Sequence, residues 1–287
     1  MINSFRSLIF VPGNNPKFLE KSKSLSADIV CLDLEDSVPG AEKKNARNLI
    51  NDILADRDKF ICSMLFVRVN TLASNMIQDD LTEIIHNGLD GIVLPKINDI
   101  NELQKIEQMI MNLEKKQNLS EGKIKIAPSI ESTKGVVNSY EIASFSSRVS
   151  MLVFGIFDLL HDLQVEYTPQ ISNTDYSRSK VPVDARAAGV PAIDAIWQDI
   201  NNTSGLVEDC ALGHSLGYSG KCVIHPNQLD TVHKIYHPSD DSIAWARQVC
   251  DVYTKSIKEG KGATTVDGKM IDEVHYKQAC DILKSVE

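Results

Sequence analysis

Charged side chains end a series of apolar runs along this chain. Buried parallel strands are near-continuous apolar runs, because helices cover both faces of their sheet. In a closed barrel of such strands, the residues at the strand ends gather at one mouth. Carboxylates at high density repel one another unless a cation lies among them. We therefore expect a reactive, cation-containing site formed by the residues that end these runs, which are Asp33, Glu35, Asp36, Arg68, Lys96, Glu131, Asp158 and Asp194.

Glu131 and Asp158 have the residue types of a magnesium site. Each follows a predicted strand and faces the expected mouth. Mg²⁺ prefers oxygen ligands and keeps waters that a substrate can displace, so two carboxylates suit it. The alternative is that both acids lie in the first turns of helices, where Asp and Glu are favoured. Their spacing leaves both interpretations open.

Two cationic residues, Arg68 and Lys96, share the same position relative to their strands. The planar guanidinium of Arg68 can hold a carboxylate through two parallel hydrogen bonds. Its alternative is a salt bridge to the strand-end acids. Lys96 can meet a phosphate or an acyl oxygen, and its alternative is a solvated lysine in a loop.

Asp33 and Glu35 are two residues apart, so both side chains should point into the barrel, whereas Asp36 begins the following loop. Inward acids at the end of a barrel are costly without a cation. We interpret Asp33 and Glu35 as outer residues of the metal site, which support its ligands or contact the metal through water.

The order of predicted elements favours a (β/α)₈ TIM-type barrel with a short C-terminal helical lid. Strands are expected over residues 7–11, 29–34, 60–69, 89–94, 124–130, 149–154, 190–196 and 221–224, with helices between most of them. Eight alternating units select a closed barrel over a doubly wound sheet. The segment 166–181 is polar and is expected to be more loop than helix.

We expect a barrel domain over residues 1–237 and a C-terminal extension over 238–287. The extension is predicted to contain a long helix to about residue 258, a short extended piece at 263–266, and a final helix at 272–286. It is too short to form a core of its own, so it must pack on the barrel or reach a neighbouring subunit.

Composition argues against several classes of main partner, although a local basic patch for a phosphorylated ligand stays possible. The formal net charge of −9 argues against nucleic acid or an anionic membrane surface. The N-terminus lacks the basic and apolar regions of a signal peptide, and no apolar stretch approaches the roughly 20 residues of a membrane span. The scattered cysteines lack metal-site spacing and suit a reducing compartment. A cytoplasmic protein is expected.

Motifs along nearly the whole chain resemble those of the citrate lyase β-subunit-like (CitE-like) family. The wider group includes malyl-CoA and citramalyl-CoA lyases and the HpcH/HpaI aldolases. The matching segments, in order, are Arg6–Asn14, Leu32–Val38, Lys43, Ala46–Arg47, Val67–Asn70, Leu94–Lys96, Ile130–Gly135, Phe154–Asp158, Gly189–Asp194, Gly220–Gln228 and Gly268–Asp272.

This resemblance implies a role for each site residue. Mg²⁺ would be held by Glu131 and Asp158, with Glu35 and Asp36 near the metal through water. Arg68 would bind an oxygen of a 2-oxo acid, and Asp272 would enter the active site of a neighbouring subunit in a trimer or hexamer. Coenzyme A would lie near Lys96 and the loop of Pro12 and Gly13.

The implied reaction is a Mg²⁺-dependent carbon–carbon cleavage. A 3-hydroxyacyl thioester of the malyl-CoA or citramalyl-CoA type would yield acetyl-CoA and a 2-oxo acid, with Asp272 as the general acid. The alternatives are the β subunit of a citrate lyase acting on an acyl-carrier thioester, a malyl-CoA thioesterase, a metal-dependent aldolase that uses free aldehydes, and a non-enzymatic binding protein.

One residue departs from the family pattern. The family usually has an acid directly before the second metal-binding carboxylate, and here that position is Phe157. The metal-binding acid itself, Asp158, is kept. The departure therefore bears on the identity of the substrate more than on the metal.

Overall fold

The computed structural model describes residues 5–168 and 174–286. The chain divides into two compact units, residues 1–233 and 234–287, with the boundary inside a helix. Each unit is described on its own below.

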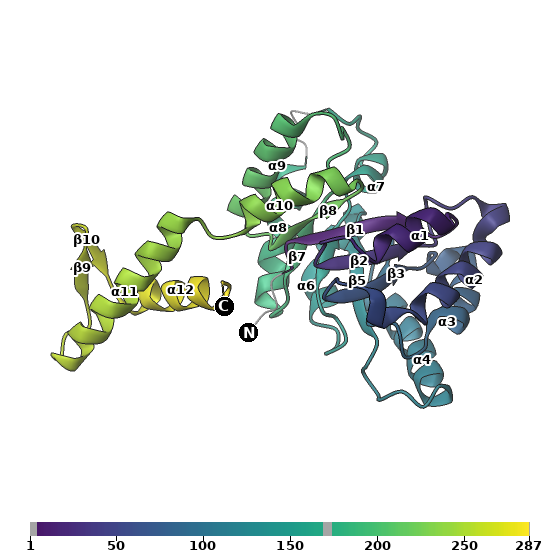
Figure 1. The fold of residues 1–287 in the computed structure, drawn as a ribbon, viewed down its shortest axis with the longest axis horizontal. Helices are drawn as coiled ribbons and strands as arrows, with labels where there is room; N and C mark the ends of the chain where they lie inside the picture. The colour runs from purple at the N-terminus through teal and green to yellow at the C-terminus, as the bar shows by residue number, and fades with distance from the viewer. Residues whose placement is uncertain (1–4, 169–173, 287) are drawn as a thin grey trace. The chain divides into compact units, whose positions relative to one another are not determined.

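Eight parallel strands close into a barrel in the first unit (Figure 1). Each strand pairs with its sequence neighbours, and β8 returns to pair with β1. The prediction of a (β/α)₈ barrel is confirmed. The strands are β1 (Ser7–Pro12), β2 (Ile29–Asp33), β3 (Met64–Arg68), β4 (Gly91–Leu94), β5 (Lys125–Ile130), β6 (Leu152–Phe154), β7 (Ala192–Asp194) and β8 (Gly220–Val223).

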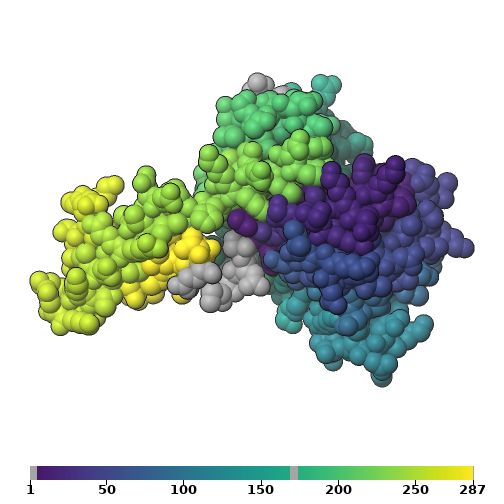
Figure 2. All heavy atoms as spheres, viewed as in Figure 1, coloured from purple at the N-terminus to yellow at the C-terminus, as the bar shows by residue number. Residues whose placement is uncertain are grey.

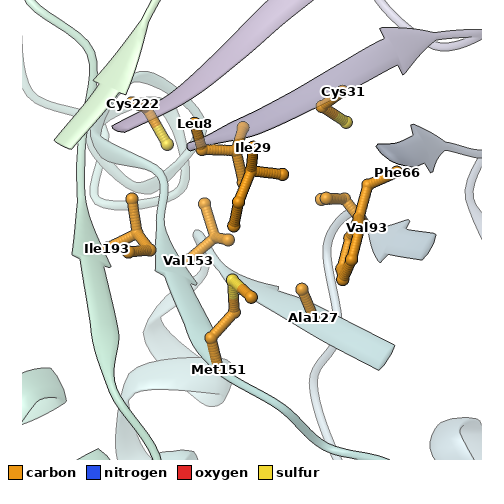
Figure 3. Packing of buried hydrophobic residues seen from close by; sticks show 10 residues of the cluster. All are labelled: Leu8, Ile29, Cys31, Phe66, Val93, Ala127, Met151, Val153, Ile193 and Cys222. Carbon is orange, nitrogen blue, oxygen red and sulfur yellow. The ribbon is translucent and has the colours of Figure 1, made fainter. Parts of the chain in front are cut away.

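The inside of the barrel is filled by side chains contributed by all eight strands or the residues beside them (Figure 3). Every second residue of a strand points inward. Gly91 makes room for the ring of Phe66, because a Cβ there would lie 2.5 Å from the ring. The barrel is therefore a packed core and not a pore. The ten side chains drawn are Leu8, Ile29, Cys31, Phe66, Val93, Ala127, Met151, Val153, Ile193 and Cys222.

Helices cover the outside of the strands, and Figure 2 shows their side chains as a continuous surface on one face of this unit. They are α1 (Pro16–Ser22), α2 (Lys43–Leu54), α3 (Ile77–Ile84), α4 (Ile100–Lys116), α5 (Thr133–Val137), α6 (Ser139–Ala143), α7 (Ile156–Asp162), α8 (Asp175–Ala187), α9 (Thr203–Ser215) and α10 (Leu229–Tyr236). Short 3₁₀ turns are η1 (Gly40–Glu42), η2 (Arg57–Lys59), η3 (Leu72–Ser74) and η4 (Pro226–Gln228). In the part of the chain that is described, no helix is long and apolar enough to cross a membrane.

The predicted loop at 166–181 was wrong in its second half, and its residues 169–173 lie outside the described residues. Helix α8 begins at Asp175 and contains Pro182. A proline inside a helix removes a backbone hydrogen bond, and the polar residues around it hid the helical pattern. The helix is stabilised by Arg178, whose side chain is buried against β7.

Asp194 does not join the mouth, which corrects the expectation for it. Ile193 points into the barrel, so its neighbour Asp194 points outward to the helices. There it accepts hydrogen bonds from Lys221 at 2.9 Å and from Arg178 Nε at 3.1 Å. Asp209 of α9 pairs with both cations. This buried group of four charges attaches α8 and α9 to β7 and β8.

The second unit consists of two helices and a hairpin. Its elements are α11 (Asp240–Lys258), β9 (Thr264–Val266), β10 (Lys269–Ile271) and α12 (Glu273–Lys284). The predicted extended piece is β9. Its partner β10 was not foreseen, although Asp267 and Gly268 between them adopt the positive φ of a tight hairpin turn. The expectation that this extension is too short for a core of its own was wrong, because Val249, Tyr253 and Ile271 lie in a small core within it.

Candidate active site at the barrel mouth

Arg68, the last residue of β3, lies beside Asp33, the last residue of β2, because the two strands are paired at this point. Its Nε and Nη2 atoms each donate to Asp33 at 2.7 Å, and its guanidinium stacks on Phe10 at 4.6 Å from the ring centroid. Burial alone would raise the pKa of Asp33, but these hydrogen bonds lower it. The salt-bridge alternative for Arg68 is thus present. Asp33, predicted as an outer metal contact, orients this arginine in the structure.

The remaining edge of Arg68 faces two further acids. Nη1 lies 3.1 Å from Glu35 Oε2 and 3.9 Å from Asp36 Oδ2. Glu35 Oε2 is nevertheless buried without a hydrogen bond from any described residue, since no N–H of the guanidinium aims at it. Burial raises the pKa of Glu35 above the ordinary value of glutamate.

Lys96 joins the acids of different strands. Its Nζ lies 3.2 Å from Glu35 Oε1, 3.1 Å from Asp158 Oδ1 and 4.0 Å from Asp36 Oδ1. Burial lowers the pKa of Lys96, but the charges of Glu35 and its neighbours outweigh this and raise it. Lys96 is therefore not the solvated loop lysine of the alternative interpretation. A cavity of about 410 Å³ opens over Glu35, Asp36 and Lys96.

Glu131, which directly follows β5, is a buried acid of the mouth. Its Oε1 accepts a 2.6 Å hydrogen bond from the backbone N–H of Lys96. Burial, followed by the charges of Asp158 and Glu35, raises the pKa of Glu131 to about 7. Gly155, at the end of β6, leaves the space for this carboxylate, since a Cβ there would lie 2.3 Å from Glu131 Oε2. Glu131 does not cap a helix, because Ser132 caps α5.

Asp158 lies in the first turn of α7, as the capping alternative predicted, and its carboxylate also contacts Lys96. An acid in the first turn of a helix can also be a metal ligand, because it interacts favourably with the helix dipole while its oxygens stay accessible. Phe157, the residue that departs from the family pattern, packs against Tyr167 with the rings tilted by 42° and their centroids 5.0 Å apart.

Pro12 and Gly13 form the turn between β1 and α1. A Cβ on Gly13 would lie 2.5 Å from the Asp33 carbonyl, so this glycine is required by packing. Pro12 lines a groove of about 270 Å³ between β1, α1 and η4, whose wall also includes Phe18, Lys21 and His225. The groove is mainly apolar with a cation at α1.

Several supporting residues could not be assigned from the sequence. Lys43 is buried and donates to the carbonyls of Leu34 and Glu35 at 2.6 Å, which fixes the loop after β2. Asp80 of α3 binds the amide of Asn70 at 2.7 Å and Arg47 at 2.9 Å. The motif residues Asn70 and Arg47 thus stabilise the loop after β3. A buried aspartate on a helix gives no signal in a single sequence.

Asp272 lies in the second unit, where it is the N-cap of α12. Its Oδ1 accepts hydrogen bonds from the backbone of Val274 and contacts His275 Nδ1 at 2.7 Å. The His275 side chain lowers the pKa of Asp272, so the group is ionised at neutral pH. Asp272 is half-exposed within its unit.

The mouth has the donors that a hard divalent cation needs. In the described part of the chain, no three acidic, imidazole or thiol side chains are gathered into a complete metal cage. Mg²⁺ is usually held by one or two carboxylates, with water and substrate completing its shell. Glu131 is buried among like charges, and Glu35 has an oxygen with no hydrogen bond. Both features fit a cation bound at Glu131 and Asp158.

Comparison with known proteins gives the family of this chain. The sequence pattern of HpcH/HpaI aldolase/citrate lyase matches residues 6–226. The chain belongs to this family. The citrate lyase subunit beta of Escherichia coli K12 is 33% identical over 98% of the chain and 93% of that protein. The (3S)-malyl-CoA thioesterase of Cereibacter sphaeroides is 28% identical over 99% of the chain and 95% of that protein.

Solved structures of the HpcH/HpaI aldolase/citrate lyase family agree with the fold. CitE from Mycobacterium tuberculosis, in complex with magnesium, acetoacetate and coenzyme A, has a TM-score of 0.78 and 26% identity, covering 98% of both chains. A citrate lyase from Burkholderia xenovorans has a TM-score of 0.85 at 16% identity, and it shows the fold alone. The resemblance expected from the sequence is confirmed.

Proposed function

We propose that this member of the family is a Mg²⁺-dependent carbon–carbon lyase. It cleaves a 3-hydroxyacyl thioester of the malyl-CoA or citramalyl-CoA type into acetyl-CoA and a 2-oxo acid. The observation that carries the proposal is a chain of ion pairs at one barrel mouth, in which Glu35 contacts Arg68 at 3.1 Å and Lys96 at 3.2 Å, and Lys96 contacts Asp158 at 3.1 Å. The M. tuberculosis relative bound to magnesium, acetoacetate and coenzyme A supports it.

Glu131 and Asp158 would hold Mg²⁺. Such an ion polarises hydroxyl and carboxylate oxygens and stabilises negative charge on them. Side chains of the protein would bind the substrate and transfer its protons.

Arg68 would bind the 2-oxo acid portion of the substrate through Nη1, because Asp33 already occupies Nε and Nη2. A guanidinium fixed on both of these atoms loses little entropy when substrate binds and stabilises charge that develops on an oxygen. Glu35 Oε2 would take the proton of the substrate hydroxyl, since it is buried without a hydrogen bond and its pKa is raised.

Cleavage moves the electrons of the carbon–carbon bond onto the thioester as an enolate, which must then be protonated. Asp272 would supply that proton from a neighbouring subunit, in a trimer or hexamer. Its lowered pKa favours the ionised form, which suits the base required in the reverse, condensing direction. For cleavage, a proton must first reach Asp272.

The groove beside Pro12 would hold the thioester arm. Its apolar wall includes Phe18, which is 51% exposed, and Lys21 provides a cation for a phosphate. Gly13 is packed against β2, so it would shape this groove without contacting the arm.

A second candidate is the citryl-lyase β subunit of a citrate lyase complex, acting on an acyl-carrier thioester. The 33% identity to the E. coli citrate lyase subunit beta favours it. Hydrolysis of malyl-CoA, suggested by the C. sphaeroides thioesterase, is a third.

Purified protein with each thioester, with and without Mg²⁺, separates these functions. Acetyl-CoA with glyoxylate or pyruvate supports the proposal. Free coenzyme A with malate indicates the thioesterase, and turnover of a citryl thioester alone indicates the citrate lyase subunit.

The matched variant is Arg68→Lys, which keeps a cation beside Asp33 but loses Nη1. Both Arg68→Lys and Arg68→Ala should abolish turnover, but Arg68→Ala also leaves Asp33 buried without its partner, at a cost of about 3–5 kcal/mol. Full activity of a folded Arg68→Lys protein would remove Arg68 from the reaction.

A further inference from the structure

The side chain of Lys96 occupies the space between acids that come from two sides of the mouth. Its ammonium lies 3.2 Å from Glu35, which follows β2, and 3.1 Å from Asp158, which follows β6. The Glu35 side chain is 8% exposed, whereas those of Lys96 and Asp158 are 36% and 38% exposed. The ammonium thus joins a buried acid to one that faces solvent.

An ammonium is needed there because the mouth holds an excess of negative charge. Asp33, Glu35 and Asp36 lie within 3.9 Å of Arg68, whose Nε and Nη2 are already taken by Asp33. Glu131 and Asp158 are close enough to Glu35 or to each other for their charges to interact. Like charges at this density repel one another, and a cation among them favours their ionised forms. Lys96 provides such a charge from within the chain.

The backbone and the side chain of Lys96 are held differently. Its φ of +56° is in the left-handed region, which costs a non-glycine residue about 1 kcal/mol or more. In this conformation its N–H donates to Glu131 Oε1 at 2.6 Å. The backbone is thereby fixed on Glu131, while the ammonium lies at the end of a flexible four-carbon stem that can move.

We propose that Lys96 is a resident counter-ion which holds Glu35 and Asp158 when no divalent cation is bound, and which releases Asp158 when one binds. The released ammonium then faces the open side of the mouth, where a carboxylate or thioester oxygen arrives. The inference rests on the proposed function, because it requires Glu131 and Asp158 to take the divalent cation.

The test compares Mn²⁺ binding in the wild type, Lys96→Met and Lys134→Met, measured by the paramagnetic resonance of free Mn²⁺. Methionine keeps the length of the stem without its charge. Lys134 is the matched control, because its Nζ makes a similar ion pair, 2.6 Å from Asp99 Oδ2. This pair does not include any acid of the cluster. Loss of a competing ammonium with two partly exposed ion pairs should tighten Mn²⁺ binding about tenfold in Lys96→Met. Lys134→Met should bind as the wild type does.

Thermal unfolding gives an independent readout. In EDTA, Lys96→Met should melt below the wild type, and Mg²⁺ should raise its melting temperature by more than it raises that of the wild type. Equal or weaker Mn²⁺ binding by Lys96→Met, when the wild type binds Mn²⁺, overturns this inference and leaves the proposed function standing. If the wild type binds no Mn²⁺, both the inference on Lys96 and the proposed function are refuted.

A measurement on the wild type decides the matter if Lys96→Met does not fold. The rate at which acetic anhydride acylates Lys96 can be followed by mass spectrometry, with Lys134 as the internal reference. Release from Asp158 should make acylation of Lys96 several-fold faster when Mg²⁺ is added. An unchanged ratio of the two rates overturns the inference.

Discussion

Replacing Glu131 by glutamine should stabilise the protein in the absence of metal, and more so as the pH rises. Burial, with the charges of Asp158 and Glu35, raises the pKa of Glu131 from 4.5 to about 7. Between these values the native state holds a proton that the unfolded chain has released, so the free energy of unfolding falls as pH rises. Since tenfold in an equilibrium constant is about 1.4 kcal/mol, the loss is on the order of 3 kcal/mol by pH 8. The glutamine of Glu131→Gln does not titrate, so this variant does not lose stability in this way as pH rises. Its side-chain oxygen can still accept the hydrogen bond from the N–H of Lys96.

The assay is urea unfolding in EDTA at intervals from pH 4.5 to 8. The chain has two tryptophans, so a Trp245→Phe background leaves Trp197 to report on the barrel unit. The advantage of Glu131→Gln over its parent should grow across this range towards about 3 kcal/mol.

Glu114→Gln is the control with the opposite sign. Glu114 is buried, which acts to raise its pKa, but hydrogen bonds from Arg148 at 2.6 and 2.8 Å and from backbone N–H groups lower it. Its carboxylate stabilises the fold above the unfolded pKa and loses this effect as pH falls. Glu114→Gln should therefore be least stable, relative to its parent, at pH 8. A difference between Glu131→Gln and its parent that stays constant from pH 4.5 to 8 would refute the reasoning for Glu131.

Three further perturbations test the site. Gly155→Ala should displace the Glu131 carboxylate and lower both turnover and Mg²⁺ binding, the latter followed by calorimetry. Gly262→Ala is the control and should leave both unchanged, because a Cβ there meets nothing within 4 Å. Asp33→Asn should free the guanidinium of Arg68 and lower kcat/KM by about a hundredfold with a smaller effect on KM, as expected for a misplaced catalytic group; an unaltered kcat would contradict this. Inactive Arg68→Lys and Asp272→Asn proteins should regain part of the activity when they are mixed and allowed to exchange subunits; a mixture that stays inactive argues against a shared active site.

The barrel could be predicted because its strands are apolar runs with regular spacing, and most strand positions were correct to within a few residues. The errors have physical causes. The helix α8 contains Pro182 and is polar, so it lacks the apolar stripe on which the prediction depended. The short strand β10 has few residues, and only the turn at Asp267 and Gly268 could have indicated it.

The sequence predicted which residues lie at the mouth where their position along a strand determines this. It did not predict the ion pairs that their side chains form. The position of Arg68, Glu131 and Asp158 at the barrel mouth was predicted from their place at or after the ends of strands, and their roles stay predictions. Asp194 was wrongly expected to point into the barrel. Neighbouring residues of a strand point to opposite faces, so an error of one residue moves a side chain from the inside to the outside. The pairing of Asp33 with Arg68 and the position of the Lys96 ammonium depend on rotamers and on competing acids, which the sequence of one chain does not encode in its spacing.

The closure of the barrel has a consequence for the synthesis of this protein. Strand β1 pairs with β8, whose residues lie about 210 positions later in the chain. A nascent chain therefore carries β1 with one open edge until nearly the whole barrel has left the ribosome, and open strand edges recruit other chains. Pairing across so large a separation is also slow to form. We therefore expect growing chains of this protein to depend on chaperones, and premature termination before Gly220 to leave a sheet with two exposed edges.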